Sequence, residues 1–199
     1  MTDSTVALIL AGGSASRMGG GDKPLLRLGG QALLVWLKAA LAPLTTAISA
    51  NGDPERFAAL GVPVLSDGPF TGQGPLAGIL AGLDWADGLG ADFLLTVPGD
   101  TPFIPGGLAT GLAPAPACAA SLGRVHHGVA LWPVTVRVAL RSLLSRPGPR
   151  GIHHFAATIG MRRVDFPAGK WDPFLNINTP EELTMARILL GRSRTEGAA

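Results

Sequence analysis

An apolar run at residues 6–10 passes directly into a glycine-rich segment, and this junction constrains the fold more than any other feature of the chain. A short apolar run that ends at glycine is typical of a central strand buried on both faces of a sheet. The glycines permit positive φ, so successive backbone N–H groups can converge on one anion. They are Gly12, Gly13, Gly19, Gly20 and Gly21. Arg17 and Lys23 add positive charge suited to phosphate oxygens. The junction therefore predicts a phosphate-binding loop.

Two common phosphate loops are excluded by the spacing of these residues. Lys23 is followed by Pro24, so the segment is not a P-loop, and its glycines do not follow the Gly-x-Gly-x-x-Gly spacing of dinucleotide-binding proteins. A flexible surface turn with two solvated basic residues is the alternative interpretation. The order of strand, glycines, Arg17 and Asp22-Lys23-Pro24 favours the phosphate loop.

Strand and helix patterns alternate along the first half of the chain. Strands are predicted at 44–50, 62–65 and 92–97, and helices at 32–42, 54–60 and 75–86. This alternation predicts a parallel sheet with helices on both faces and right-handed crossovers. Ligands bind such sheets at the carboxyl ends of the strands. Gly12, Asn51, Asp67 and Asp100 each follow a predicted strand, so we expect them to share one edge.

The second half of the chain is less regular. Strands are predicted at 117–122 and 129–134, joined through 123–128, and at 163–166; helices are predicted at 136–144 and 152–158. Thr179, Pro180 and Glu182 have the spacing of a capping box with proline in the first turn, which predicts a last helix to Leu190. We expect residues 191–199 to form a frayed tail.

Composition limits the class of protein. With 199 residues, 47% of them hydrophobic, the chain suffices for one core, so we expect a single domain over 1–199. The one cysteine, Cys118, excludes an intrachain disulfide, and its alanine-rich surroundings favour packing. No apolar stretch approaches the roughly 18 residues that span a bilayer, and the N-terminus lacks a basic flank. We expect a cytoplasmic protein without a membrane contact, and the net charge of +2 argues against nucleic-acid binding.

The residues from Leu10 to Lys23 fit the pattern Leu-Ala-Gly-Gly-x-x-x-Arg-Met-Gly-x-x-Asp-Lys at every fixed position. This pattern resembles the signature of nucleotidyltransferases of the sugar-nucleotide pyrophosphorylase type, most closely the molybdenum cofactor guanylyltransferases. Further similar segments are 49–51, 74–78, 100–102 and 176–183. The resemblance implies a three-layer Rossmann-like nucleotidyltransferase fold with a mostly parallel central sheet and helices on both faces. Similar enzymes that transfer other nucleotides often carry alanine where this chain has Gly12. By this resemblance, Gly12 indicates a guanine nucleotide.

The resemblance also implies an activity, the transfer of GMP from GTP to the terminal phosphate of molybdopterin (Mo-molybdopterin) with release of pyrophosphate. The implied catalytic residues are Arg17, Lys23 and Asp100. The implied binding residues are Leu10, Ala11, Gly12, Gly13, Lys23, Asn51, Asp67, Gly78, Asp100, Asn176 and Asn178. The expected partners are GTP and molybdopterin, with other molybdenum cofactor biosynthesis proteins or molybdoenzyme chaperones as further candidates. The alternatives are a cytidylyl or sugar-phosphate transferase and a non-catalytic GTP-binding adaptor in cofactor delivery.

Asp100 is the expected ligand of Mg²⁺. This ion prefers oxygen ligands and is usually held by one or two carboxylates together with substrate phosphates, so one aspartate at the end of a buried strand suffices. The alternative is that Asp100 caps the turn at Thr101-Pro102.

Other candidate residues also have ordinary alternatives. Asn51 and Asp67 can read a purine edge, but both stand in strong turn sequences. Gly78 belongs to a predicted helix start, where free N–H groups favour an anion or a base carbonyl. Asn176 and Asn178 alternate along an extended segment, so both amides share one face and can bind the pterin or serve as turn residues.

His126 and His127 are neighbours on an expected strand, so they should point to opposite faces and not share a metal. The related family tends to show His-Pro here. His126 therefore matches the family and His127 departs from it.

Charge is divided unevenly along the chain. Residues 1–123 hold five Lys or Arg and nine Asp or Glu, a net of −4, whereas residues 124–199 hold eleven and five, a net of +6. With the resemblance, this split predicts a nucleotide-binding half at about 1–123 and an acceptor-binding half at about 124–190. Arg162, Arg163 and Lys170 would attract the anionic acceptor. A scattered, solvated surface is the alternative.

Overall fold

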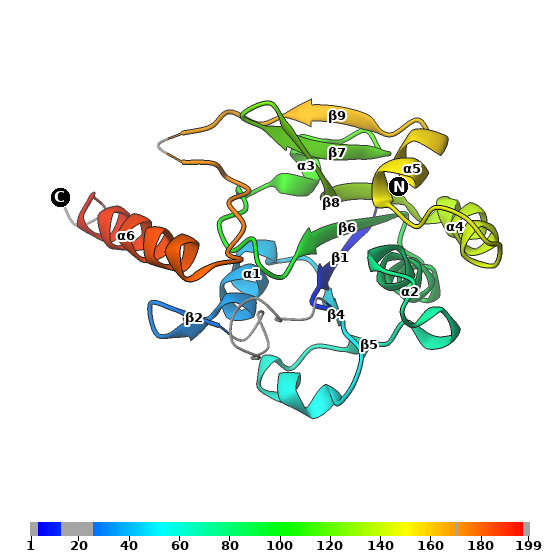
Figure 1. Cartoon of the computed structure of the whole chain (residues 1–199), viewed down its shortest axis with the longest axis horizontal. Coiled ribbons are helices and arrows are strands. Elements are labelled where there is room, and N and C mark those ends of the chain that lie inside the picture. The colour runs from blue at the N-terminus through cyan, green and yellow to red at the C-terminus, as the bar shows by residue number, and fades with distance from the viewer. Residues whose placement is uncertain (1–3, 13–25, 170, 197–199) are drawn as a thin grey trace.

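The structure, a computed structural model, describes residues 4–12, 26–169 and 171–196. In this part of the chain a seven-stranded sheet has the order β5-β4-β1-β6-β8-β7-β9 (Figure 1). The strands are β1 (Thr5–Leu10), β4 (Thr46–Ser49), β5 (Val64–Leu65), β6 (Phe93–Pro98), β7 (Ala117–Ser121), β8 (Arg124–Pro133) and β9 (Arg162–Asp165). β8 is antiparallel to both of its neighbours, and every other pairing in this sheet is parallel. The predicted mostly parallel sheet is confirmed.

Helices cover both faces of this sheet, which confirms the three-layer α/β fold (Figure 1). One face carries α1 (Leu33–Leu41) and α3 (Leu108–Leu112). The other face carries α2 (Pro75–Gly88), α4 (Arg137–Leu144) and α5 (Ile152–Thr158). The short 3₁₀ helices η2 (Pro54–Leu60), η3 (Gly68–Phe70) and η4 (Val134–Val136) lie in connections.

The central strand β1 explains why two layers of helices are needed. Ala7 and Ile9 belong to the hydrophobic cluster that contains the buried side of α1, while Val6 and Leu8 belong to the cluster that contains α2. Successive side chains of a strand point to opposite faces, so an unbroken apolar run requires cover on both. The helices on both faces provide this cover for residues 6–10.

Helix α2 lies close to the sheet because it carries glycine at two positions four residues apart. A Cβ added to Gly82 would lie 2.4 Å from Cδ2 of Leu8, and one added to Gly78 would lie 2.2 Å from Oγ of Ser49. Glycine within a helix costs about 1 kcal/mol relative to alanine. Here its missing Cβ permits close packing, which brings the first turn of α2 next to the end of β4.

The turn between β7 and β8 differs from the prediction. Residues 123–128 were expected to be a connection, but β8 begins at Arg124 and pairs with β7 through a two-residue turn, Leu122–Gly123. Both turn residues have positive φ, 48° and 78°, as the tightest hairpins require. The polar residues at the start of β8 hid this part of the strand from sequence reasoning. β8 pairs with β6 only through Ala130–Pro133, so its first half extends past the carboxyl end of β6.

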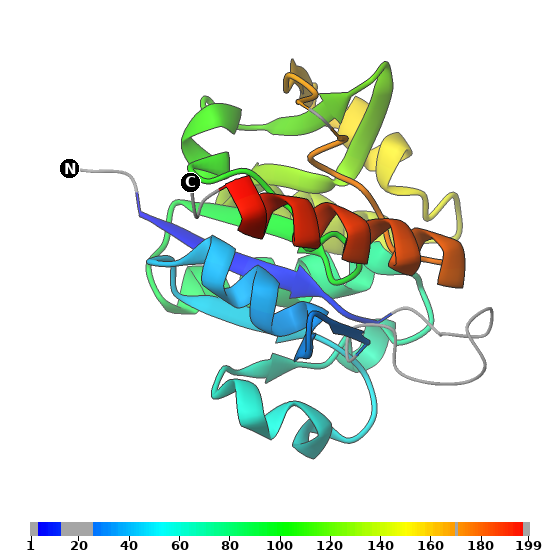
Figure 2. The ribbon, with the colours of Figure 1, turned by 90° about the vertical axis from the view of Figure 1, so that its left-hand side faces the viewer.

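A third small core lies beside α1. The hairpin of β2 (Arg27–Leu28) and β3 (Gln31–Ala32) was not predicted, and it packs with the C-terminal helix α6 (Pro180–Glu196). Figure 2 shows α1 and α6 in front of the sheet. The residues buried in this core are Leu28, Leu33, Ile177 and Ala186.

The start of α6 confirms the predicted capping box, whereas its end differs from the prediction. The N–H of Glu182 donates to Oγ1 of Thr179 (3.2 Å), and the N–H of Thr179 donates to Oε2 of Glu182 (2.9 Å). The helix continues to Glu196 instead of ending at Leu190, so a tail beginning at residue 191 is wrong. A single glycine such as Gly191 weakens a helix by about 1 kcal/mol and does not by itself end it.

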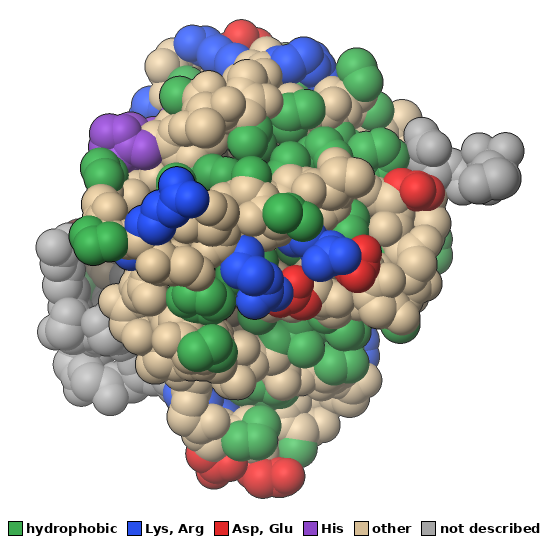
Figure 3. Space-filling model, turned by 90° about the vertical axis from the view of Figure 1, so that its right-hand side faces the viewer, with side chains coloured by type: hydrophobic (Ala, Val, Ile, Leu, Met, Phe, Trp, Pro, Cys, Tyr) green, Lys and Arg blue, Asp and Glu red, His purple; other side chains and the backbone are tan. Residues whose placement is uncertain are grey.

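Basic residues of the second half of the chain form ion pairs with acidic residues of the first half, between helices α4 and α2. Arg137 of α4 binds Asp87 of α2 with a nitrogen–oxygen distance of 3.0 Å, and Arg141 binds Asp84 in the same way. Figure 3 shows the α2, α4 and α5 side of the molecule, where basic and acidic side chains stand next to one another. Part of the basic charge of the second half thus neutralises acidic charge of the first.

Cys118 is buried in β7, and burial raises the pKa of its thiol above the usual value. A thiol held neutral in the core is unreactive, as the packing interpretation predicts. Within the described residues, no helix is both long and apolar enough to span a membrane.

Candidate active site

A cavity of about 540 Å³ opens at the carboxyl edge of the sheet. This volume lies within the range of small-molecule binding sites. It is lined from β1, β4, β6 and β8, from the loop after β5, and from the starts of α2 and α5. The lining residues are Leu10, Gly12, Ser49, Asn51, Asp67, Gly72, Gly74, Pro75, Gly78, Pro98, Gly128 and Ile152.

The end of β1 enters this cavity with Leu10 and Gly12, as the strand-end prediction requires. Ala11, between them, is 5% exposed, packs in the core, and donates its N–H to the carbonyl oxygen of Ser49 at 2.9 Å. Its amide is therefore engaged in the sheet and is not aimed at a ligand. The other proposed loop residues, Gly13, Arg17 and Lys23, lie outside the described residues.

Asn51 and Asp67 form a reciprocal pair at the ends of β4 and β5. Nδ2 of Asn51 donates to Oδ2 of Asp67 at 2.7 Å, and the N–H of Asp67 donates to Oδ1 of Asn51 at 3.0 Å. These two bonds engage both the oxygen and the nitrogen of the Asn51 amide. Asn51 thus orients Asp67, and Asp67 is the residue better placed to meet a ligand.

The carboxylate of Asp67 reaches the first turn of α2. Its Oδ1 lies 3.4 Å from the position that a Cβ on Gly78 would occupy, and that Cβ would also overlap Oγ of Ser49. Gly78 therefore leaves room for the two side chains beside the helix. The N-terminus of α2 has no side-chain cap; Pro75 at its start carries no N–H, and the N–H of Ala77 donates to the carbonyl oxygen of Gly74 at 3.1 Å. This first turn, with the positive end of the helix dipole, borders the same cavity as the Asp67 carboxylate.

Asp100 is half-buried in the turn that follows β6, two residues beyond the cavity residue Pro98. The backbone holds this turn: the N–H of Thr101 donates to the carbonyl oxygen of Pro98 (3.2 Å), and the N–H of Ile177 donates to that of Asp100 (2.8 Å). Within the described residues, no three His, Cys, Asp or Glu side chains are grouped so that they could hold a metal ion. A metal bound by Asp100 would need oxygen ligands from the substrate and water.

Asn176 and Asn178 lie in the segment that precedes α6, beside the turn of Asp100. Oδ1 of Asn176 accepts a hydrogen bond from Oγ1 of Thr101 at 2.7 Å, and the N–H of Asn178 donates to Oε2 of Glu182 at 2.6 Å. Ile177 between them is fully buried, in accord with the predicted alternation.

Five of the proposed binding residues line the cavity, and four lie elsewhere. Those in the lining are Leu10, Gly12, Asn51, Asp67 and Gly78; those outside it are Ala11, Asp100, Asn176 and Asn178. Sequence reasoning missed Gly128 and Ile152, which come from the second half of the chain. A glycine within an apolar strand pattern signals a close approach, and a Cβ on Gly128 would lie 3.1 Å from Cγ of Pro98. Ile152 carried no such signal.

His126 and His127 point to opposite faces of β8, as predicted. The ring of His126 packs on Phe174 with a centroid distance of 5.1 Å, and the ring of His127 lies 6.4 Å from that of His153 in α5. Burial lowers the pKa of both histidines below the ordinary value of 6.5. For His126 the nearby Asp172 carboxylate opposes this effect.

The lowered pKa of His126 predicts a pH-dependent stability. His126 of the unfolded chain binds a proton near pH 6.5, whereas His126 of the folded chain binds it only at lower pH. Its contribution to the free energy of unfolding is therefore complete above pH 6.5 and is lost as the pH falls. We expect His126→Gln, which cannot titrate, to show a shallower loss of unfolding free energy between pH 7.5 and about pH 5. Urea denaturation at a series of pH values measures this. Parallel curves for the two proteins would contradict it.

The arginines that were expected to attract the acceptor have other partners. Arg162 donates to the carbonyl oxygens of Leu112 (2.7 Å) and Pro114 (2.6 and 3.0 Å), at the end of α3. Arg163 pairs with Asp165 on the exposed surface of β9, and the hydrogen bond to this carboxylate raises the pKa of the guanidinium. Lys170 lies outside the described residues. Both guanidinium groups thus have partners within the protein, and attraction of the acceptor by Arg162 and Arg163 stays a prediction.

The fold and the site define a class of protein. A mostly parallel sheet whose strand ends surround one cavity, with a helix that begins at the same edge, is typical of α/β proteins that bind nucleotides. The chain belongs to the MobA-like NTP transferase domain family, whose sequence model matches residues 7–160.

Individual relatives extend over most of the chain. It is 53% identical, over 182 residues, to a protein of Acidiphilium cryptum named molybdenum cofactor guanylyltransferase, with 90% of this chain and 92% of the relative covered. A protein of the same name from Cereibacter sphaeroides is 51% identical, with 92% and 95% covered. Molybdopterin-guanine dinucleotide biosynthesis protein A from Archaeoglobus fulgidus has the same fold, with a TM-score of 0.71 at 22% identity and coverage of 94% and 98%.

Proposed function

We propose that the protein is a single-domain molybdenum cofactor guanylyltransferase. It transfers GMP from GTP to the terminal phosphate of molybdopterin, forms molybdopterin guanine dinucleotide and releases pyrophosphate. The relatives that share half of its residues carry the name of this activity. The observation that carries the proposal is the cavity at the carboxyl edge, where the Asp67 carboxylate is held next to the start of α2.

Guanine suits the groups that border this cavity. Its N1–H and 2-amino group are donors, and a carboxylate can accept both, because an ionised carboxylate has acceptor sites on two oxygens. Asn51 engages Oδ2 of Asp67, so Oδ1 is the oxygen toward α2. The carbonyl O6 of guanine is an acceptor with partial negative charge, which the positive dipole end at the start of α2 favours.

Asp100 fits a divalent cation by the chemistry of its donor atoms. Its carboxylate offers hard oxygen ligands at the end of the buried strand β6, and Mg²⁺ binding through one carboxylate, phosphates and water requires no larger protein cage. When bound, such a cation neutralises phosphate charge and stabilises charge that develops on the leaving pyrophosphate.

The transfer needs orientation more than it needs a protein nucleophile. An oxygen of the acceptor phosphate attacks the α-phosphorus of GTP, the new P–O bond forms, and the bond to the β-phosphate oxygen breaks with its electron pair on pyrophosphate. The attacking phosphate is already an anion, so no general base is required. Positioning and charge stabilisation supply most of the catalysis in such reactions. In this proposal Arg17 and Lys23 hold the departing pyrophosphate, and Asn176 and Asn178 lie on the acceptor side.

Incubation with Mg²⁺, molybdopterin and each nucleoside triphosphate in turn tests the function. We expect pyrophosphate release with GTP, and only when molybdopterin is present. Release with CTP in preference to GTP would replace the proposal with a cytidylyl transferase. Tight binding of GTP without any release, under conditions where the product would be detected, would favour a binding protein instead.

A further inference from the structure

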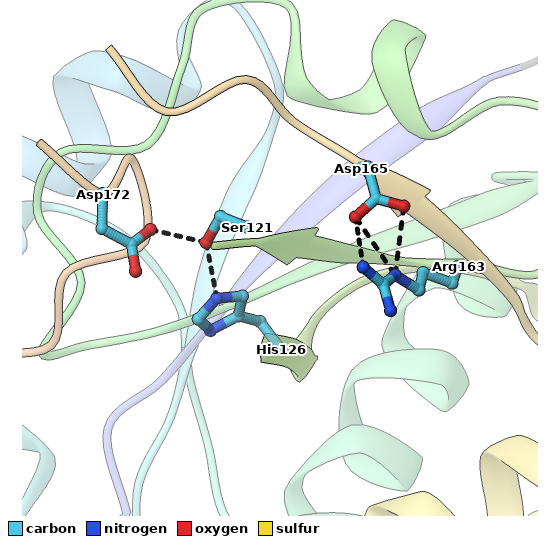
Figure 4. A network of polar contacts seen from close by, with 5 residues as sticks. All are labelled: Ser121, His126, Arg163, Asp165 and Asp172. Carbon is cyan, nitrogen blue, oxygen red and sulfur yellow. Dashed lines mark hydrogen bonds and ion pairs between the residues drawn. The ribbon is translucent and has the colours of Figure 1, made fainter. Parts of the chain in front are cut away.

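Three polar side chains join the second half of the sheet to the segment before α6 (Figure 4). Oγ of Ser121, the last residue of β7, donates to Oδ1 of Asp172 at 2.6 Å and lies 2.8 Å from Nε2 of His126. Asp172 Oδ1 also accepts the N–H of Phe174 at 2.9 Å. Ser121 is 1% exposed, whereas His126 and Asp172 are half-buried. We call Ser121, His126 and Asp172 the polar clasp.

The direction of these bonds excludes a nucleophilic serine. The proton of the Ser121 hydroxyl is directed to Asp172, so its oxygen accepts from Nε2–H of His126. A nucleophilic serine instead gives its proton to the imidazole, and the acid orients the far ring nitrogen. Here serine lies between the acid and the imidazole. The arrangement is suited to holding two pieces of chain together.

The clasp holds one end of residues 172–178, and the turn of Asp100 holds the other. Phe174 is 1% exposed and packs between the rings of His126 (5.1 Å) and Phe166 (5.3 Å). At the other end, Thr101 binds Asn176, and the N–H of Ile177 binds the carbonyl oxygen of Asp100. β7 and β6 are separated in the sheet by β8. The segment therefore connects the strand end that carries Asp100 to the second half of the sheet across β8.

We propose that Ser121 and Asp172 are positioning residues that hold residues 172–178 against the sheet edge, so that Asn176 meets the acceptor substrate beside Asp100. This inference rests on the proposed function. Neither residue lines the nucleotide cavity, whose walls come from other elements. Loss of the clasp should therefore weaken use of the acceptor and leave GTP binding nearly unchanged.

Four variants test the inference, with two readouts. Ser121→Ala and Asp172→Ala remove the clasp, and Asp172→Asn keeps an oxygen acceptor. Asp165→Ala is the matched control, since it removes the exposed ion pair with Arg163 on the neighbouring strand β9. Hydrogen exchange of residues 172–178, followed by mass spectrometry, reports the position of the segment whether or not the protein turns over. Steady-state kinetics give separate KM values for molybdopterin and GTP.

We expect Ser121→Ala and Asp172→Ala to accelerate exchange in residues 172–178 by about tenfold or more, as the loss of a hydrogen bond to a charged group implies. The KM for molybdopterin should rise by a similar factor, while the KM for GTP changes by less than about twofold. Asp172→Asn should lie between Asp172→Ala and the wild type, and Asp165→Ala should match the wild type.

Unchanged exchange in residues 172–178 of Ser121→Ala and Asp172→Asn would overturn the inference, even if Asp172→Ala does not fold. Equal increases in both KM values would overturn it as well, because they indicate a general loss of structure. Absence of transfer by the wild type with every nucleotide would refute the proposed function and with it the acceptor role. In that case the exchange measurement alone still decides whether the clasp positions the segment.

Discussion

Asp100→Asn is expected to lower kcat for guanylyl transfer by about 10³-fold, because a metal ion worth several kcal/mol in the transition state loses its protein carboxylate. The fold should survive. The turn is held by backbone hydrogen bonds from Thr101 and Ile177, and neither bond involves the Asp100 side chain. Turnover at saturating Mg²⁺ and GTP, with circular dichroism to check folding, measures this effect.

Asp92→Asn is the matched control for that experiment. Asp92 is an exposed aspartate that directly precedes the first residue of β6, at the end of the strand opposite to Asp100. Its side chain accepts a hydrogen bond from the N–H of Ser4 at 2.8 Å. Asparagine can accept this bond too, so kcat should remain at the wild-type level. Wild-type turnover by a folded Asp100→Asn protein would show that Asp100 does not bind the catalytic metal.

Asp67→Asn is expected to weaken GTP binding by about 10²-fold and to reduce the preference for GTP over ATP, since buried hydrogen bonds to a charged group are replaced by an opposed donor. The new amide oxygen can take the place of Oδ2 and accept from Nδ2 of Asn51. The amide nitrogen then replaces Oδ1 beside Gly78 and meets the guanine donors with a donor of its own. Calorimetric titration with each nucleotide measures both changes.

Two further variants distinguish a loss of base recognition from a general disturbance of the loop after β4. Asp53→Asn alters a nearby exposed carboxylate, which accepts the N–H of Glu55 at the start of η2, and should leave both affinities unchanged. Asn51→Ala should weaken GTP binding, and its effect should not add to that of Asp67→Asn, because Asn51 acts through Asp67. Full additivity would contradict the role of Asn51 as an orienting residue.

Local patterns of the sequence were sufficient for most of the fold. The apolar run of β1, the alternation of strands and helices up to β6, and the capping box before α6 were all predicted, since each depends on residues within a few positions of one another. The same patterns placed Gly12, Asn51 and Asp67 at one sheet edge, because parallel strands end on the same side. The phosphate-binding role of the loop at 13–25 stays a prediction.

Elements with weak local signals were missed or misplaced. The hairpin of β2 and β3 and the helix α3 are short, so they carry little periodicity. The first half of β8 is polar because it extends beyond β6, and its pairing with β7 is what makes it a strand. Such elements form through contacts with distant parts of the chain.

The sequence by itself determined the class of fold and the edge of the sheet at which the cavity opens, because hydrophobic periodicity and strand ends are local properties. Only the tertiary structure decided which polar groups meet. Asn51 is bound to Asp67 across 16 positions and Ser121 to Asp172 across 51, while Arg162 is turned toward carbonyl oxygens of the α3 end. Hydrogen bonds are satisfied within a buried neighbourhood, and packing of the whole chain creates that neighbourhood. No spacing in the sequence encodes these partners.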